Sequence, residues 1–258
     1  MRSYFLLLIA FLLLNGKSIV AYSQEPDSTK AKGSEVSFGV DAGFTNKYMW
    51  RGMCYNQGLV FQPDAYVSYG NLSLSSWSNI SLWDKNSEKN NEVDFTLTYT
   101  NSLFNFDIES SFNYYYYLNY PDVNTSEFFI RLGYPIGDFN LFTGFYVDIL
   151  HTPGALYDEL GVEYEKELSD KWTVAGSLFT GMANSKFNSY YLSDENQPEF
   201  NKSAFNLLSA NANLSYSPVK DFSINAHFQF NHTLDKELTQ SLLNTNSNYF
   251  EIILTKEF

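Results

Sequence analysis

The chain has little of what catalytic and disulfide-rich proteins use: one cysteine, three histidines and seven prolines in 258 residues. The single cysteine, Cys54, allows no disulfide within the chain, which excludes a disulfide-stapled scaffold. His151, His227 and His232 stand without a nucleophile motif or a ligand-like spacing beside them. We therefore expect no catalytic residue, no metal site and no cofactor.

Basic residues are also scarce, because 16 Lys and Arg stand against 29 Asp and Glu, for a formal net charge of −13 at pH 7. Nucleic-acid binding needs a basic footprint, so we expect no nucleic-acid partner. Aromatic residues are abundant, with 20 Tyr and 23 Phe, although the mean hydropathy is only −0.27. This composition fits a large soluble core or the interfacial girdles of a membrane barrel, and periodicity must separate the two.

The first 23 residues differ from the rest. Arg2 precedes an apolar run over 4–14 that is too short to cross a bilayer comfortably, and residues 21–23 form a small-x-small cleavage site. We predict a secretory signal peptide over 1–23, the alternative being an uncleaved anchor. A polar periplasmic leader over 24–34 then precedes a single domain over 35–258.

That domain alternates apolar and polar residues almost to its last residue, as do strands with one apolar and one polar face. In residues 92–99, for example, Val93, Phe95, Leu97 and Tyr99 oppose Glu92, Asp94, Thr96 and Thr98. About twelve such segments occur, each near the 9–11 residues of a tilted membrane-crossing strand. They lie at roughly 35–46, 58–69, 72–83, 91–101, 103–115, 125–134, 139–150, 156–167, 172–183, 203–216, 222–232 and 247–258.

Short and long connections alternate between these segments. We expect tight turns at 70–71, 101–102, 135–138, 168–171 and 217–221, and longer loops between them, the first being the stretch 45–58. This asymmetry is typical of outer-membrane barrels, with periplasmic turns and extracellular loops. We predict an all-β, antiparallel, up-and-down transmembrane barrel of about 12 strands, the alternative being a soluble sandwich or lipocalin-like barrel.

The chain ends on Phe258, a terminal aromatic on an amphipathic last segment. This ending resembles the signal read by the outer-membrane barrel assembly machinery. We therefore expect that machinery and outer-membrane lipid to be partners of a protein located in the bacterial outer membrane.

If the apolar faces contact lipid, the polar faces line a lumen. The alternation of side chains along each strand then predicts these pore-lining residues: Asp41, Asp64, Trp77, Asn79, Glu92, Asp94, Asp107, Glu109, Glu127, Arg131, Asp148, Glu159 and Glu163. A lining dominated by one sign of charge concentrates counter-ions, so we expect a porin-like channel for small solutes that prefers cations. The alternatives are that the acids are only solvated lining, or that loops plug the bore.

The aromatic and charged stretch "NKYMWRGMCYNQG" (46–58) is placed by this scheme in the first external loop. There Arg51 can pair with lumen carboxylates and Trp50 can stack, so we expect Tyr48, Trp50, Arg51 and Gly52 to form a motif at the mouth. The alternative is that Tyr48 and Trp50 are girdle residues and Arg51 a solvated charge.

This stretch, with "SSWSNIS" (75–81), "EVDFTLTYT" (92–100) and "YYYYLNYPDVNTSEFF" (114–129), resembles the TorF-like porins, a bacterial family of uncharacterised function. The resemblance covers about 45–130, implies an outer-membrane barrel and departs at Cys54, where serine is common. The positions that match the family are Tyr48, Arg51, Gly52, Trp77, Asn79, Glu92, Asp94, Tyr120, Pro121 and Glu127.

Two other classes of function stay open. A structural or adhesive barrel would act through its long loops, of which 184–202 and 233–246 are large enough. An outer-membrane barrel enzyme would need a nucleophile or an acid paired with a histidine, and no such pairing is visible. The pattern favours the channel.

Overall fold

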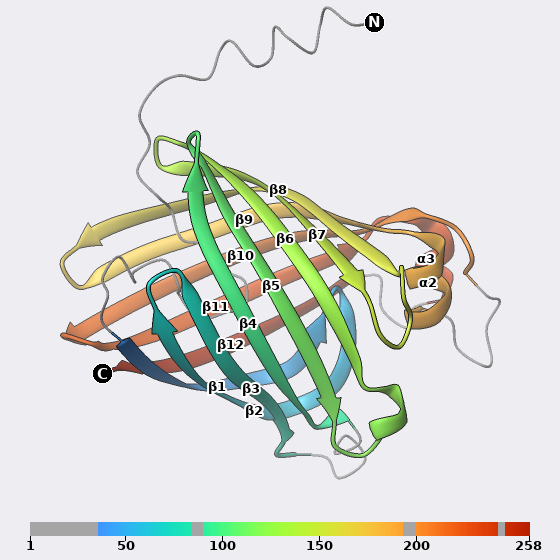
Figure 1. Cartoon of the computed structure of the whole chain (residues 1–258), viewed down its shortest axis with the longest axis horizontal. Helices are drawn as coiled ribbons and strands as arrows, with labels where there is room; N and C mark the ends of the chain where they lie inside the picture. The colour runs from blue at the N-terminus through green and yellow to red at the C-terminus, as the bar shows by residue number, and fades with distance from the viewer. Residues whose placement is uncertain (1–35, 84–89, 193–199, 242–245) are drawn as a thin grey trace, which may run out of the picture.

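The computed structural model describes residues 36–83, 90–192, 200–241 and 246–258. The expected signal peptide and periplasmic leader lie outside these residues. The described residues form a closed barrel of twelve antiparallel strands (Figure 1), which confirms the predicted fold class. Among the described residues, no helix is long and apolar enough to cross a membrane.

The strands follow one another around the barrel in chain order, and β1 closes it by pairing with β12 from Gly39↔Glu257 to Thr45↔Glu251. Their bounds are β1 Val36–Trp50, β2 Met53–Tyr69, β3 Leu72–Ser81, β4 Glu92–Leu103, β5 Phe106–Tyr117, β6 Thr125–Ile136, β7 Phe139–Asp148, β8 Leu156–Ser169, β9 Trp172–Ala183, β10 Ala204–Val219, β11 Phe222–Thr233 and β12 Asn246–Glu257.

One end of the barrel carries only two-residue connections, at 70–71, 104–105, 137–138, 170–171 and 220–221, and we call it the turn end. The turn expected at 101–102 is wrong, because the β4–β5 pairing continues through Ser102↔Asp107 to Leu103↔Phe106. The Ser102 hydroxyl donates a hydrogen bond to Asp107 across this extension, at 2.8 Å. Phe104 and Asn105 make the turn instead, with φ of 50° and 65°.

The opposite end, the loop end, carries the longer connections 82–91, 118–124, 149–155, 184–203 and 234–245. They contain the 3-10 helix η3 (Pro121–Val123) and the helices α2 (Ser185–Tyr191) and α3 (Lys236–Ser241). Figure 1 shows α2 and α3 together at this end. This alternation of two-residue turns with longer connections matches the predicted asymmetry.

The first connection departs from that asymmetry. The expected loop over 45–58 is wrong, because β1 and β2 run through it and turn at Arg51 and Gly52. Both turn residues have positive φ, 48° for Arg51 and 83° for Gly52, a conformation that glycine adopts without cost. The β1–β2 register shifts between Thr45 and Lys47 and again between Tyr48 and Met49. Such bulges bend a strand pair, and here they bend the hairpin tip.

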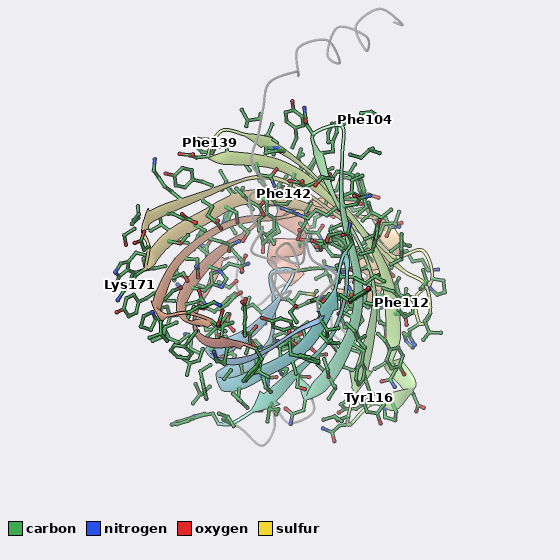
Figure 2. The ribbon with its side chains drawn as sticks, turned by 60° about the vertical axis from the view of Figure 1, so that its left-hand side comes forward. Phe104, Phe112, Tyr116, Phe139, Phe142 and Lys171 are labelled. Atoms are coloured by element: carbon green, nitrogen blue, oxygen red, sulfur yellow. The ribbon has the colours of Figure 1, made fainter. Side chains whose placement is uncertain are left out.

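The two faces of the wall divide as the alternation predicts. Large apolar side chains are exposed on the outer surface, among them Phe38 at 53% and Leu74 at 50%, whereas the inward Asn79 and Ser209 are fully buried. In Figure 2, Phe112 and Tyr116 lie on the outside of the wall and Phe142 points into the bore. The wall therefore presents hydrocarbon outward and polar groups inward, the arrangement a bilayer requires.

Candidate functional site

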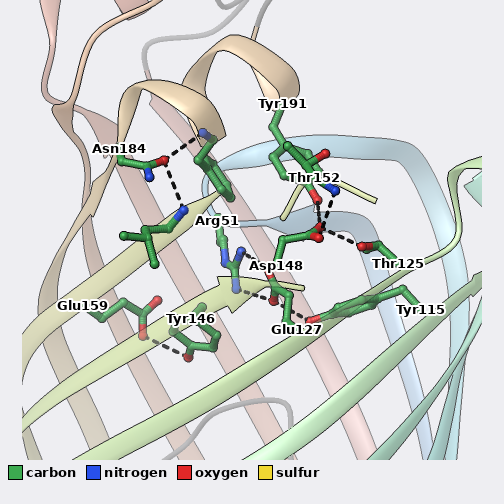
Figure 3. A network of polar contacts seen from close by, with 12 residues as sticks. Arg51, Tyr115, Thr125, Glu127, Tyr146, Asp148, Thr152, Glu159, Asn184 and Tyr191 are labelled. Carbon is green, nitrogen blue, oxygen red and sulfur yellow. Dashed lines mark hydrogen bonds and ion pairs between the residues drawn. The ribbon is translucent and has the colours of Figure 1, made fainter. Parts of the chain in front are cut away.

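The hairpin between β1 and β2 reaches across the bore at the loop end. Its tip residue Arg51 donates hydrogen bonds from Nη1 and Nη2 to the two carboxylate oxygens of Glu127 on β6, at 2.7 and 2.8 Å. In the closed ring of twelve strands, β6 lies five strands from β1 and is next to β7, the strand opposite β1. The ion pair therefore spans the bore, and Figure 3 shows the two side chains meeting inside it.

Aromatic rings enclose the Arg51 guanidinium. Its Cζ lies 4.3 Å from the ring centroid of Trp50, 4.4 Å from Tyr146 and 4.6 Å from Tyr157. The ring of Phe187 on α2 follows at 5.5 Å. A guanidinium over aromatic faces gains cation–π attraction, and a bidentate carboxylate fixes its plane. With side-chain exposures of 6% for Arg51 and 2% for Glu127, the pair is shielded from solvent.

The enclosing rings depend on close approach at one glycine. Tyr157 on β8 lies directly over Gly181 on β9, where a Cβ would come within 2.0 Å of the tyrosine hydroxyl. Glycine at this position lets the ring lie flat against the wall and face Arg51. The predicted site includes neither Tyr146 nor Tyr157, although the alternation of β7 and β8 places both side chains on the inner face. Phe187 lies in a loop helix, where no strand parity applies.

Two neighbouring carboxylates tie the loops to the wall. Glu127 also accepts a hydrogen bond from the Tyr115 hydroxyl at 2.8 Å. Asp148 accepts hydrogen bonds from the Thr125 hydroxyl at 2.7 Å, the Tyr191 hydroxyl of α2 at 3.3 Å and the backbone N–H of Thr152 at 2.9 Å (Figure 3). It also accepts one from the backbone N–H of residue 150 at 3.0 Å. The connection 149–155 and helix α2 are thereby held at the mouth.

An apolar cluster completes the loop end. Its buried members are Met53, Ala155, Tyr157, Ala183, Phe187, Leu192, Phe200, Ala204 and Leu238, with Trp50, Tyr55, Tyr146 and Tyr191 packed against them. The members come from the hairpin, the strand ends, α2, α3 and the connections 149–155 and 184–203. Side chains of the described residues thus occupy the bore between the hairpin tip and the far wall.

A cavity of about 840 Å³ lies on the other side of this closure. Its lining begins at Trp50 and Arg51 and reaches Lys171 and Asp221 in the two-residue turns of the turn end. Eleven Asp and Glu side chains line it against four Lys and Arg. Three of the carboxylates have a basic partner: Glu163 lies 2.6 Å from Arg131, Asp221 lies 3.8 Å from Lys220, and Glu251 lies 3.6 Å from the His227 ring. The lining keeps a large excess of carboxylates.

The expected pore-lining residues divide between this cavity and its surroundings. Seven line the cavity: Asp41, Asp64, Trp77, Asp94, Arg131, Glu159 and Glu163. Six do not, namely Asn79, Glu92, Asp107, Glu109, Glu127 and Asp148. Of these, Glu127 and Asp148 make the hydrogen bonds described above at the loop end.

The remaining four lie elsewhere in the wall. Asn79 accepts a hydrogen bond from the Gln62 amide at 2.9 Å, and Glu92 accepts one from the Tyr48 hydroxyl. Asp107 accepts a hydrogen bond from Ser102 near the turn end, and Glu109 is the register partner of Arg131.

Phe258 is 74% exposed, and its backbone N–H donates to the carbonyl of Phe38 at 2.8 Å across the β1–β12 closure. The terminal aromatic is therefore accessible at the turn end.

No protein-family model matches the chain, and no curated protein matches it. Among solved structures, the KdgM porin superposes with a TM-score of 0.53 at 13% identity, over 86% of this chain and 99% of that one. An outer membrane channel from Pseudomonas putida F1 gives 0.53 at 9% identity, over 91% and 100%. The NanC porin gives 0.50 at 13%, over 85% and 98%. The chain therefore has the barrel fold of outer-membrane porins and channels.

Proposed function

We propose that this protein is an outer-membrane channel through which small solutes diffuse passively, with a preference for cations. The observation that carries the proposal is the charge of the cavity, where eleven carboxylate side chains stand against four Lys and Arg. Low-dielectric walls lined by one sign of charge attract counter-ions and exclude co-ions. The resemblance of the fold to porins and channels supports a transport role.

The same charge argues against acidic oligosaccharides as solutes. A KdgM porin structure is described as a complex with oligogalacturonate, a polyanion. An acidic lining repels such a ligand, so the shared fold does not carry that specificity to this chain. The preferred solutes are small and cationic or neutral.

The proposal includes a location. The turn end faces the periplasm and the loop end faces the medium, as in other barrels with this asymmetry. The signal peptide over 1–23 directs export, and Phe258 is the residue that the assembly machinery reads. The TorF-like resemblance over 45–130 belongs to the same proposal, because its matching positions include Arg51 and Glu127 of the mouth.

Liposome swelling with three sugars of matched size tests the proposal. Glucosamine, glucose and galacturonate differ mainly in charge at neutral pH. We expect swelling to be fastest with glucosamine, intermediate with glucose and slowest with galacturonate. Fastest entry of galacturonate would refute the cation preference.

One observation favours a second candidate, a structural or adhesive barrel acting through its loops. The hairpin tip and the apolar cluster occupy the bore at the loop end. If all three sugars fail to enter liposomes that contain folded barrels, this second candidate replaces the channel.

A further inference from the structure

Three aspartates and two aromatic residues form one row around the inner wall. Asp41 on β1 is the register partner of Asp64 on β2, which pairs with Trp77 on β3. Trp77 pairs with Asp94 on β4, and Asp94 with Tyr115 on β5. All five side chains line the cavity. The row is therefore a continuous acidic and aromatic surface at one level of the bore.

The carboxylates of this row have unused hydrogen-bonding capacity. Asp64 is only 6% exposed, and its Oδ1 has no hydrogen-bond partner among the described residues. The Oδ1 atoms of Asp41 and Asp94 are also buried and have no hydrogen-bond partner among the described residues. Buried acceptors left without a donor cost free energy, and a ligand that supplies N–H groups removes that cost.

Trp77 decides which kind of cation fits. It stands between Asp64 and Asp94, whose strands are roughly 10 Å apart at the usual strand spacing. Within the described ranges, no group of three or more His, Cys, Asp or Glu side chains is placed to hold a metal ion. An indole face between two carboxylates suits instead a cation with an apolar body, which stacks on the ring while its N–H groups reach a carboxylate.

We infer that the row Asp64–Trp77–Asp94 is a binding site for primary alkylammonium ions. The ammonium group donates to a carboxylate oxygen of Asp64 or Asp94 that rotation of the side chain turns toward the cavity, and the alkyl chain lies on the Trp77 indole. The inference names a solute class for the proposed channel and rests on that function for its biological meaning. Binding itself is measurable without conduction.

Titration calorimetry of the protein refolded in detergent micelles, at constant ionic strength, tests the site. The probes are n-butylammonium, the neutral n-butanol and sodium ion. We expect n-butylammonium to bind at least about tenfold more tightly than either of the others, since it alone offers both a charge and an apolar chain. Equal affinity for n-butylammonium and sodium would overturn the inference.

Variants locate the binding. Asp64→Asn and Asp94→Asn should each weaken n-butylammonium binding about tenfold, and Trp77→Leu about three- to tenfold. Asp107→Asn is the matched control, since Asp107 is an inward carboxylate outside the cavity lining and should leave the affinity unchanged. Retained heat-modifiable mobility in gels identifies the folded variants. Unchanged affinity in folded Asp94→Asn and Trp77→Leu would also overturn the inference.

Failure of this site and failure of the channel are distinguishable. A barrel that conducts cations but binds n-butylammonium no better than sodium refutes the site alone. A barrel that binds n-butylammonium through Trp77 but never conducts refutes the channel alone.

Discussion

Arg51 and Glu127 are 76 residues apart in the chain and meet inside the barrel, where two parallel hydrogen bonds join the first hairpin to the opposite wall. The pair is almost fully removed from solvent. A buried charge that loses its partner is costly, whereas replacing both partners by apolar groups is often tolerated. The hairpin position thus depends on both residues together.

Removing one partner should therefore cost more than removing both. We expect Glu127→Met to destabilise the folded barrel by about 3–5 kcal/mol, because it leaves the Arg51 charge buried. The double variant Arg51→Met with Glu127→Met should recover part of that loss. Denaturant unfolding in detergent, followed by tryptophan fluorescence, measures the cycle. If the losses of unfolding free energy in Arg51→Met and Glu127→Met add up to the loss in the double variant, the two residues are not coupled.

The same hairpin should limit the current. Arg51→Ala removes the guanidinium that fills the space between the Trp50, Tyr146 and Tyr157 rings, so the bore at the loop end widens. We expect larger or more frequent conductance steps than in the wild type in planar bilayers. Lys171→Ala, at the turn end of the cavity, is a control that leaves the mouth intact. Identical conductance in wild type and Arg51→Ala would place the restriction elsewhere.

Gly181 should not accept a side chain. A methyl group there meets the Tyr157 hydroxyl, and overpacking of this kind costs about 1–3 kcal/mol. We expect Gly181→Ala to lower the unfolding midpoint and to disturb the ring that faces Arg51. Gly137→Asn is the control, because its turn position is open and asparagine tolerates its positive φ of 63°. Equal midpoints for the two variants would contradict the packing account.

The loop around α3 should respond to acid. Although partial burial raises the pKa of Asp235, the backbone N–H groups of Glu237 and Leu238 and the ammonium of Lys202 outweigh it and hold that pKa below its ordinary value. A lowered folded-state pKa contributes stability above the unfolded-state value, and this contribution is lost as pH falls through the folded-state value.

Asparagine keeps the cap hydrogen bonds and loses only the charge, so Asp235→Asn should destabilise the start of α3 by about 0.3–1 kcal/mol at pH 7 and by less at pH 3. Amide hydrogen exchange of residues 236–238 at the two pH values measures the difference. A loss of protection that is equal at both values would show that the charge of Asp235 contributes nothing.

Period-two alternation was enough to predict the barrel, because a wall with lipid outside and water inside imposes it on every strand. Parity also assigned Asp64, Trp77 and Asp94 to the inner face, where they line the cavity. Turn positions were less predictable. The polar pair at 101–102 looks like a turn, yet cross-strand pairing carried the strands on to Phe104 and Asn105.

The mouth was predicted only in part. That Arg51 can reach a lumen carboxylate follows from its position, but that Glu127 is the partner depends on which strand stands opposite in the closed ring. The bulges that bend the hairpin leave no clear pattern in the sequence around Thr45 and Tyr48. Phe187 comes from a loop helix, whose position over the bore depends on contacts with Trp50 and Tyr157.

The most direct test of the central claim is the reversal potential of the refolded protein in a planar bilayer under a potassium chloride gradient. The acidic cavity predicts discrete conductance steps with a cation-selective reversal potential. Replacing Asp41, Asp64 and Asp94 together by asparagine should move that potential toward zero, since all three line the cavity. A reversal potential at zero or of anion-selective sign in the folded wild type would contradict the account.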